Sequence, residues 1–290
     1  MARRLLNDEP VSKLAAWSSR LAVFALAVAA LSVVILRSGL LEIGPSLATF
    51  AAALVCAGMA IVLALLSFIV IWRHGLTGLG RSLLGLVLGA ALLAYPAYLA
   101  QRAWRYPQIY DVSTDAANPP RYIALAAQRP KDRIVYSAAA APLQRAAYPD
   151  IVPLQLTLPL RSTYDVVTGV LNKRKQVFVE SMGPTVNRRE AVIEYTARTP
   201  LMGFRDDIVI RITAVGNNAS RVDLRSASRY GTHDLGANAA RLRTLLEEID
   251  EASGNAPEPK PEPVPAKKPP PKRPAQKPKT YVGLLSSPLP

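Results

Sequence analysis

The chain has 290 residues, of which 50% are apolar and only 19% charged, a composition too apolar for a chain that is soluble throughout. The single cysteine, Cys56, excludes an internal disulfide and a cysteine-rich zinc site. With only two histidines, His74 and His233, a multi-histidine metal centre is not expected either. We therefore expect membrane spans, no metal and no cofactor.

Three uncharged stretches in the first 105 residues predict membrane-spanning helices. They cover residues 21–36, which residues 17–19 lengthen if Arg20 snorkels toward the headgroups, then residues 46–72 and residues 82–100. Trp17, Trp72 and Trp104 lie at or near the ends of these stretches, where an indole is favoured. A cleaved signal peptide is the competing interpretation of the first stretch, but no small-residue cleavage site is visible. We expect residues 1–105 to form a three-helix anchor in the lipid bilayer.

The basic residues near the spans predict the orientation of the anchor, because Lys and Arg in short loops translocate poorly. Six lie on the side of the N-terminus and three on the other: Arg3, Arg4, Lys13, Arg20, Arg73 and Arg81 against Arg37, Arg102 and Arg105. This favours a cytoplasmic N-terminus. In a bacterium with two membranes, the anchor then lies in the inner membrane and everything after Trp104 is periplasmic, so nucleic acid is not an expected partner.

No charged residue lies in the middle of a span, so the anchor lacks the ionisable groups of a proton or ion path. Two pairs of small residues, Gly85 with Gly89 and Ala53 with Ala57, have the spacing that lets helices approach closely. Packing within this three-helix bundle explains them better than a dedicated dimer interface.

Residues 106–254 have the composition of a soluble domain. Its first part is rich in loop-forming residues and is either an extended lead-in packed on the domain or a disordered linker. A helix capped by Ser162 or Thr163 and ending near Asn172 is expected next, followed by strands at residues 176–181, 190–197, 207–213 and 221–226. Leu242, Leu245, Leu246 and Ile249 give a final amphipathic helix. The order predicts an α+β domain, an antiparallel sheet with helices on one face.

Two segments resemble the bacterial and plastid family called domain of unknown function (DUF) 1499. They read RTPLMGFRDDIVIRI from residue 198 and VDLRSASRYGTHDLGANAARLR from residue 222. The matching positions are Gly203, Phe204, Asp206 and Asp207, then Arg225, Ser226, Ser228 and Arg229, then Gly231, Asp234, Gly236 and Asn238. The resemblance covers roughly residues 110–250. Many relatives carry an early Ser-Pro-Asn-Cys element, where this chain has the cysteine-free STDAANPP, so a role of that cysteine does not carry over. The family has no established activity, so the resemblance implies a domain boundary rather than a mechanism.

Ten residues of these segments are candidate ligand-binding residues: Arg198, Asp206, Asp207, Arg225, Ser226, Ser228, Arg229, His233, Asp234 and Asn238. Arginines flanked by hydroxyls can hold a phosphate, a carboxylate or an acidic glycan, because the guanidinium fork binds two oxygens at once. The competing interpretation is structural. In it, Arg and Asp pair across strands, Asp234 caps the last helix, and Asn238 binds loop backbone. We favour the structural interpretation, since pairing and capping use the same residue types.

A hydrolase is the alternative function, with Ser226 or Ser228 as nucleophile, His233 as base and Asp234 or Asp206 as its orienting carboxylate. Against it, the chain has no Gly-x-Ser-x-Gly element. A mechanism with Asp206 and Asp207 as paired carboxylates is a weaker alternative still, because neighbours on a strand face opposite sides.

Residues 255–290 form a proline-rich basic tail that is too polar to bury a core, so we expect it to be disordered or extended. Its cations suit an anionic lipid or a cell-wall polymer, although a solvated tail without a fixed partner is an equal alternative. The sequence thus predicts a membrane-anchored envelope protein that acts as a non-enzymatic binding or scaffold module.

Overall fold

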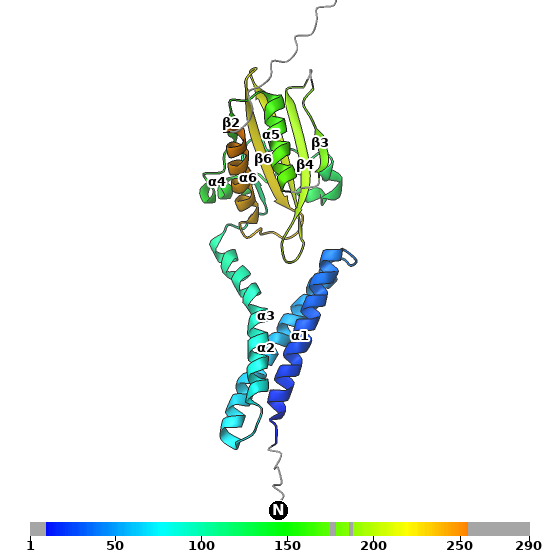
Figure 1. Ribbon diagram of the computed structural model, residues 1–290, viewed down its shortest axis with the longest axis vertical. Helices are drawn as coiled ribbons and strands as arrows, with labels where there is room; N and C mark the ends of the chain where they lie inside the picture. The colour runs from blue at the N-terminus through cyan, green and yellow to red at the C-terminus, as the bar shows by residue number, and fades with distance from the viewer. Residues whose placement is uncertain (1–9, 175–177, 186–187, 255–290) are drawn as a thin grey trace, which may run out of the picture. The chain divides into compact units, whose positions relative to one another are not determined.

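The computed structural model describes residues 10–174, 178–185 and 188–254 (Figure 1). Three long helices come first: α1 (Lys13–Ser38), α2 (Ile43–His74) and α3 (Leu79–Arg105). The other elements are β1 (Asp111–Ser113), two short 3₁₀ helices η1 (Leu125–Gln128) and η2 (Lys131–Arg133), α4 (Ala140–Ala147), β2 (Leu154–Leu156), α5 (Leu160–Lys173), β3 (Phe178–Met182), β4 (Glu190–Arg198), β5 (Arg205–Val215), β6 (Ala219–Ser228) and α6 (Ala237–Gly254). The fold is a three-helix anchor followed by an α+β domain, as the sequence predicts.

All three anchor helices are long and apolar enough to cross a membrane. They pack through small side chains, which let helix backbones approach closely. In α1 every buried residue is alanine or serine, and Ser18 donates a hydrogen bond to the Ala60 carbonyl of α2 at 2.8 Å. A Cβ on Gly89 would lie 3.0 Å from the Ala57 carbonyl oxygen. The prediction that the small-residue pairs pack within one bundle is confirmed.

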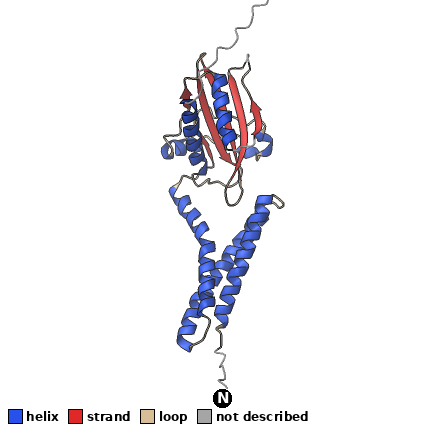
Figure 2. Ribbon diagram, viewed as in Figure 1, coloured by secondary structure: helices blue, strands red, loops and turns tan. Residues whose placement is uncertain are grey.

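The domain is built on one antiparallel sheet, drawn in red in Figure 2, with strand order β1-β6-β5-β4-β3. The short β2 also pairs with β6, where Gln155 lies opposite Arg221, while β1 pairs farther along, where Val112 lies opposite Ser226. The two strands of the lead-in thus follow one another along the same edge of β6. The lead-in is ordered and packed, and the alternative of a disordered linker is wrong.

Helices α5 and α6 cover one face of the sheet. Their buried side chains form the main core with the alternating isoleucines of β5, Ile208, Ile210 and Ile212, which are fully buried as the strict alternation predicts. The start of α5 differs from the prediction. The residue before the helix is Pro159, whose restricted φ suits a helix start, and the Thr163 hydroxyl instead hydrogen-bonds the Ser220 hydroxyl at 2.6 Å.

The lead-in covers the second face of the sheet. Tyr122 and Leu125 are buried there against Val192, Val209 and Ala227 of three central strands. The sheet is therefore buried on both faces, by helices on one and, on the other, by the part of the lead-in around Tyr122 and the 3₁₀ helix η1. Residues 176–177 of the first expected strand, which corresponds to β3, and the proline-rich tail, residues 255–290, lie outside the described residues.

Candidate functional site

The sheet divides most of the ten candidate residues between its two faces. Side chains alternate along a strand, so Asp206, Ser226 and Ser228 face α6 whereas Asp207, Arg225 and Arg229 face the lead-in. Asp206 and Asp207 therefore face opposite sides of the strand, as the sequence predicts.

Asp207 is the centre of a buried ion-pair layer on the lead-in side. It is fully buried and binds two guanidiniums: Arg129 Nη1 at 2.8 Å from Oδ2, and Arg229 through Nε and Nη2, each at 2.8 Å from a carboxylate oxygen. The hydroxyl of Thr196 on the neighbouring strand donates a further hydrogen bond to Oδ1 at 2.8 Å. Both carboxylate oxygens are therefore occupied by donors from the protein itself.

Arg225 forms the second ion pair of this layer. Its Nε and Nη2 bind the two oxygens of Asp111 on β1 at 3.0 and 2.7 Å, the bidentate geometry that favours Arg. Burial raises the pKa of Asp111, while the hydrogen bond and charge of Arg225 oppose that shift. Arg225 is only 1% exposed and is among the largest fully buried side chains of the described chain. An external anion would have to displace Asp111 to reach it.

Tyr122 connects the two ion pairs. The guanidinium carbons of Arg129 and Arg225 each lie 4.6 Å from the centre of its ring, within cation–π range. Its hydroxyl donates to the Asp207 carbonyl at 2.9 Å, and burial raises the pKa of this phenol well above its usual range. Glu194 adds a third carboxylate by accepting the backbone N–H groups of Ile123 and Leu125. We call six of the buried charged residues on this face the ion-pair layer: Arg129, Arg225, Arg229, Asp111, Asp207 and Glu194. The layer contains equal numbers of arginines and carboxylates.

The candidates on the other face form a second internal cluster, beneath α6. Ser226 donates to Asn238 Oδ1 at 2.7 Å and accepts from Arg241 Nη1 at 2.9 Å. Arg241 also binds Asp206 at 2.6 Å, and Asn238 donates to Ser228 Oγ at 3.1 Å. These polar groups satisfy one another between the sheet and the first turn of the helix.

Asp234 caps α6, as the structural interpretation expects. Its two oxygens accept the backbone N–H groups of Gly236 at 2.9 Å and Asn238 at 3.0 Å. Burial raises its pKa, and these hydrogen bonds oppose the shift. The Asn238 amide donates to the Tyr110 carbonyl at 3.0 Å, so it holds loop backbone in place.

Two candidates lie outside both clusters. Arg198 is exposed at the end of β4, opposite Arg205. His233 accepts the Leu235 backbone N–H on its Nδ1 at 3.0 Å. Within the described residues, no hydrogen bond joins His233 to Ser226 or Ser228, so the serines and the histidine of the hydrolase alternative are not assembled. The described residues also contain no cluster of His, Cys, Asp and Glu that could hold a metal ion.

Sequence reasoning missed several members of these clusters: Tyr122, Arg129, Asp111, Glu194 and Arg241. One signal was available. Val192, Val209 and Ala227 are apolar although they face away from the isoleucines, which indicates that the second face is covered. Nothing in the irregular lead-in shows by periodicity that Tyr122 and Arg129 supply the cover.

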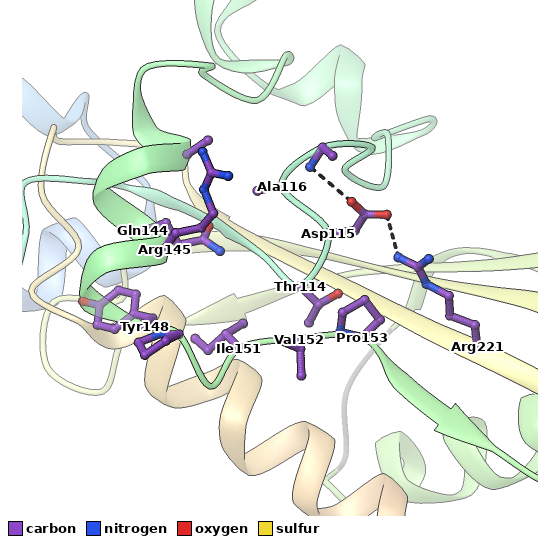
Figure 3. A pocket seen from close by; sticks show the side chains of 13 residues that line it. Thr114, Asp115, Ala116, Gln144, Arg145, Tyr148, Ile151, Val152, Pro153 and Arg221 are labelled. Carbon is purple, nitrogen blue, oxygen red and sulfur yellow. Dashed lines mark hydrogen bonds and ion pairs between the residues drawn. The ribbon is translucent and has the colours of Figure 1, made fainter.

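An open groove lies beside α4 (Figure 3), with a volume of about 690 Å³. Its apolar wall contains Ile151, Val152 and Pro153, and the buried ring of Tyr148 lies next to them. The groove is lined by Thr114, Asp115, Ala116, Ala117, Ala141, Gln144, Arg145, Tyr148, Pro149, Ile151, Val152, Pro153 and Arg221. No sequence pattern indicates this groove.

The polar groups of the groove differ in how they are partnered. Asp115 and Arg221 pair at 2.6 Å, and Figure 3 shows this contact. Gln144 is committed to the backbone of Ser113. Arg145 is exposed and forms no ion pair with any described carboxylate. Burial raises the pKa of Tyr148 to about 12, and its hydroxyl has no hydrogen-bond partner among the described residues.

Comparison with known proteins gives a family match for the domain but no activity. No curated protein matches the chain. Two solved structures are slightly similar, each over 36% of this chain. TTHA0849 from Thermus thermophilus has 9% sequence identity and a TM-score of 0.19, with 95% of that chain covered. The Zhui aromatase/cyclase from Streptomyces sp. R1128 has 10% identity and a TM-score of 0.15, with 84% of that chain covered. Similarities this slight support no argument. Residues 111–249 match the family described as protein of unknown function (DUF1499), which confirms the resemblance over this region.

Proposed function

We propose that this protein is a membrane-anchored, non-enzymatic binding module whose domain holds an amphipathic anion in the groove beside α4. The observation that carries the proposal is Arg145, an exposed cation with no carboxylate partner among the described residues, at an otherwise largely apolar groove. The arginines of the family motif, Arg225 and Arg229, are buried against Asp111 and Asp207. Their role as ligand-binding residues is thus a weaker hypothesis than binding in the groove.

The groove suits a ligand with an apolar body and an acidic head. Its volume falls in the range of small-molecule sites, roughly 300–1,000 Å³. The side chains of Ile151, Val152 and Pro153 can remove an alkyl or aryl group from water, which is favourable at about 25 cal/mol per Å². The guanidinium of Arg145 can then bind a carboxylate, sulfonate or phosphate at one end.

The test is a calorimetric titration of the full chain, reconstituted in lipid nanodiscs, with octanoate, and with octanol as the uncharged comparison. We expect octanoate to bind more tightly than octanol, and Arg145→Ala to weaken octanoate binding roughly 2- to 5-fold, the range for an exposed ion pair. Arg161→Ala is the matched control, because Arg161 is an exposed arginine on α5 outside the groove. Equal octanoate affinity in wild type and Arg145→Ala would refute the proposal.

We further propose that the anchor lies in the inner membrane of a bacterial envelope with the domain in the periplasm, which the excess of Lys and Arg on the N-terminal side supports. The lysine-rich tail then faces anionic lipid or cell-wall polymer. Fusions of alkaline phosphatase and of a cytosolic fluorescent protein to the C-terminus test this orientation. Active phosphatase with a dark fluorescent protein is expected, and the reverse pattern would overturn it.

A further inference from the structure

The loop between β4 and β5, residues 199–204, has an apolar composition that neither the ion-pair layer nor the groove uses. It reads Thr-Pro-Leu-Met-Gly-Phe. Pro200 is exposed and Leu201 is 40% exposed at its tip. We call residues 199–204 the apolar loop.

The apolar loop is held in one conformation by its own hydrogen bonds. The backbone N–H of Thr199 donates to the Phe204 carbonyl at 2.8 Å, and the N–H of Gly203 donates to the Thr199 carbonyl at 3.1 Å. The Thr199 hydroxyl accepts the Phe204 N–H at 2.9 Å, and Gly203 has φ +71°, which a side chain rarely adopts. These hydrogen bonds hold the exposed side chain of Leu201 in a defined position on the surface of the domain.

Two arginines flank the apolar loop. Arg198 and Arg205 lie opposite one another in the last register pair of β4 and β5. Both are exposed, and neither forms an ion pair with a carboxylate in the part of the chain that the structure describes. Arg198 donates a hydrogen bond to the Arg37 carbonyl at the end of α1 at 3.2 Å, and Arg37 donates to the Leu201 carbonyl at 3.1 Å. An apolar tip between two arginines that have no carboxylate partner has the chemistry that binds a lipid surface, with the tip among acyl chains and the cations among phosphates.

The connectivity of the chain brings this loop to the end of the domain that is nearest the membrane. Asp111, the first residue of β1, follows the interfacial Trp104 by seven residues, which span at most roughly 24 Å. Asp111 pairs with Ala227, Ala227 with Asp207, and Asp207 with Thr196, so these four residues form one row across the sheet.

The strand directions then place the apolar loop on the membrane side of that row. β4 continues beyond Thr196 to the loop, on the side from which the chain enters β1, because β1 and β6 are antiparallel and so are β5 and β4. At about 3.3 Å per residue the loop tip extends roughly 10–15 Å past the row, within the length of the tether. The opposite hairpin, between β5 and β6, lies at the far end of the sheet.

We propose that the apolar loop inserts into the lipid interface on the side of the membrane where α3 ends, with Arg198 and Arg205 binding lipid phosphates. The anchor already holds the domain at the surface, so a weak contact of two or three side chains is enough to orient it. The inserted loop fixes which end of the sheet faces the bilayer and leaves the groove, which is lined by other segments, accessible.

The test compares two positions on the full chain reconstituted into vesicles of phosphatidylcholine and phosphatidylglycerol that contain lipid-attached quenchers. In a Cys56→Ala background, Leu201→Cys and Val215→Cys each carry the same environment-sensitive fluorophore. Val215 is the matched control, since it is 49% exposed at the opposite hairpin. Both leaflets contain quencher, so the result does not depend on the orientation of the protein or on binding in the groove.

We expect quenching of the label at position 201 to be at least about twofold stronger than at position 215, as for an interfacial side chain. It should increase with the phosphatidylglycerol fraction and decrease in the double variant Arg198→Glu, Arg205→Glu. Equal quenching at the two positions would overturn the proposal, and so would quenching at position 201 that ignores both lipid charge and the reversed arginines, because the cations would then have no role. Circular dichroism checks that each variant is folded.

Discussion

Replacement of Asp207 by alanine tests the idea that the ion-pair layer holds the lead-in on the sheet. The carboxylate is fully buried and accepts hydrogen bonds from Arg129, Arg229 and Thr196. Its removal leaves two guanidiniums in the interior, with Arg129 no more than partly compensated by the carbonyls of Ala227 and Arg133.

The expected loss of stability is large because the remaining charges are buried. Breaking a buried ion pair by deleting one partner costs about 3–5 kcal/mol, mostly from the charge that stays behind without its partner. For a domain of this size, about 3 °C of melting temperature corresponds to 1 kcal/mol, so Asp207→Ala should lower the Tm by roughly 10–15 °C. A double variant that also replaces Arg229 by alanine should lose less stability than the sum of the two single variants, since it removes one unpaired charge together with its partner.

The assay is thermal unfolding of the full chain in detergent, followed by near-UV circular dichroism. Asp150→Ala is the control. Asp150 also pairs with an arginine, Arg243, but its side chain is 52% exposed, and such surface pairs contribute about 0–1 kcal/mol. If Asp207→Ala melted within a degree or two of Asp150→Ala, the layer would not be the element that holds the lead-in, and the argument from burial would be wrong.

Three further predictions concern other parts of the domain. Gly236→Ala should lower the free energy of unfolding in urea by about 1–3 kcal/mol, because φ is +77° and the new Cβ would lie 2.8 Å from a ring carbon of Tyr106. Gly169→Ala, in a helix with open space around it, should instead raise it by about 0.5–1 kcal/mol. Equal effects of the two variants would contradict this reasoning. Ser226→Ala should cost about 1–3 kcal/mol by leaving buried partners unsatisfied; a variant as stable as wild type would refute that role. Burial raises the pKa of Tyr136 and Tyr195 from 10.0 to about 12, so the folded state keeps protons that the unfolded state loses. The free energy of unfolding should therefore keep its full value below pH 10 and fall as the pH rises toward 12. Tyrosinate absorbance should appear together with unfolding and not before it.

The regular half of the domain was predictable because its patterns are strict. Ile208, Ile210 and Ile212 alternate with polar residues, and the final helix presents Leu242, Leu245 and Ile249 at helical spacing. The anchor was predictable for a similar reason, since long uncharged stretches have few alternatives to a membrane helix. Each of these features is encoded within one short segment of the sequence.

The lead-in and the groove were not predictable, because they depend on contacts between distant segments. The pair of Arg225 with Asp111 joins residues far apart in the sequence, and Gln144 of α4 binds the backbone of Ser113. The strand β1 has only three residues, too few to show a period of two. Arg145 is recognisable as a candidate ligand-binding residue only in the folded structure, where distant segments form the groove around it.

The ion-pair layer also explains why charged residues, rather than an apolar layer, cover this face of the sheet. A segment without regular secondary structure leaves backbone groups that must find partners when it is buried. The side chains of the layer supply them: Arg225 donates to the carbonyls of Pro120 and Ile134, and Glu194 accepts the N–H groups of Ile123 and Leu125.

A leucine in place of Arg225 or Glu194 would leave those backbone groups unsatisfied, whatever it gained in apolar burial. Arg225, Arg229 and Asp207 of the family motif thus help to dock an irregular segment onto the sheet. The chain continues from this segment into α4, which carries Arg145, and then into the wall of the groove. The layer therefore helps to fix the position of Arg145, although the charged residues of the layer do not line the groove. A lesion in the layer, such as Asp207→Ala, should therefore reduce octanoate binding through loss of folded domain, whereas Arg145→Ala should reduce it with the Tm unchanged, and the two effects can be separated by measuring both quantities on each variant.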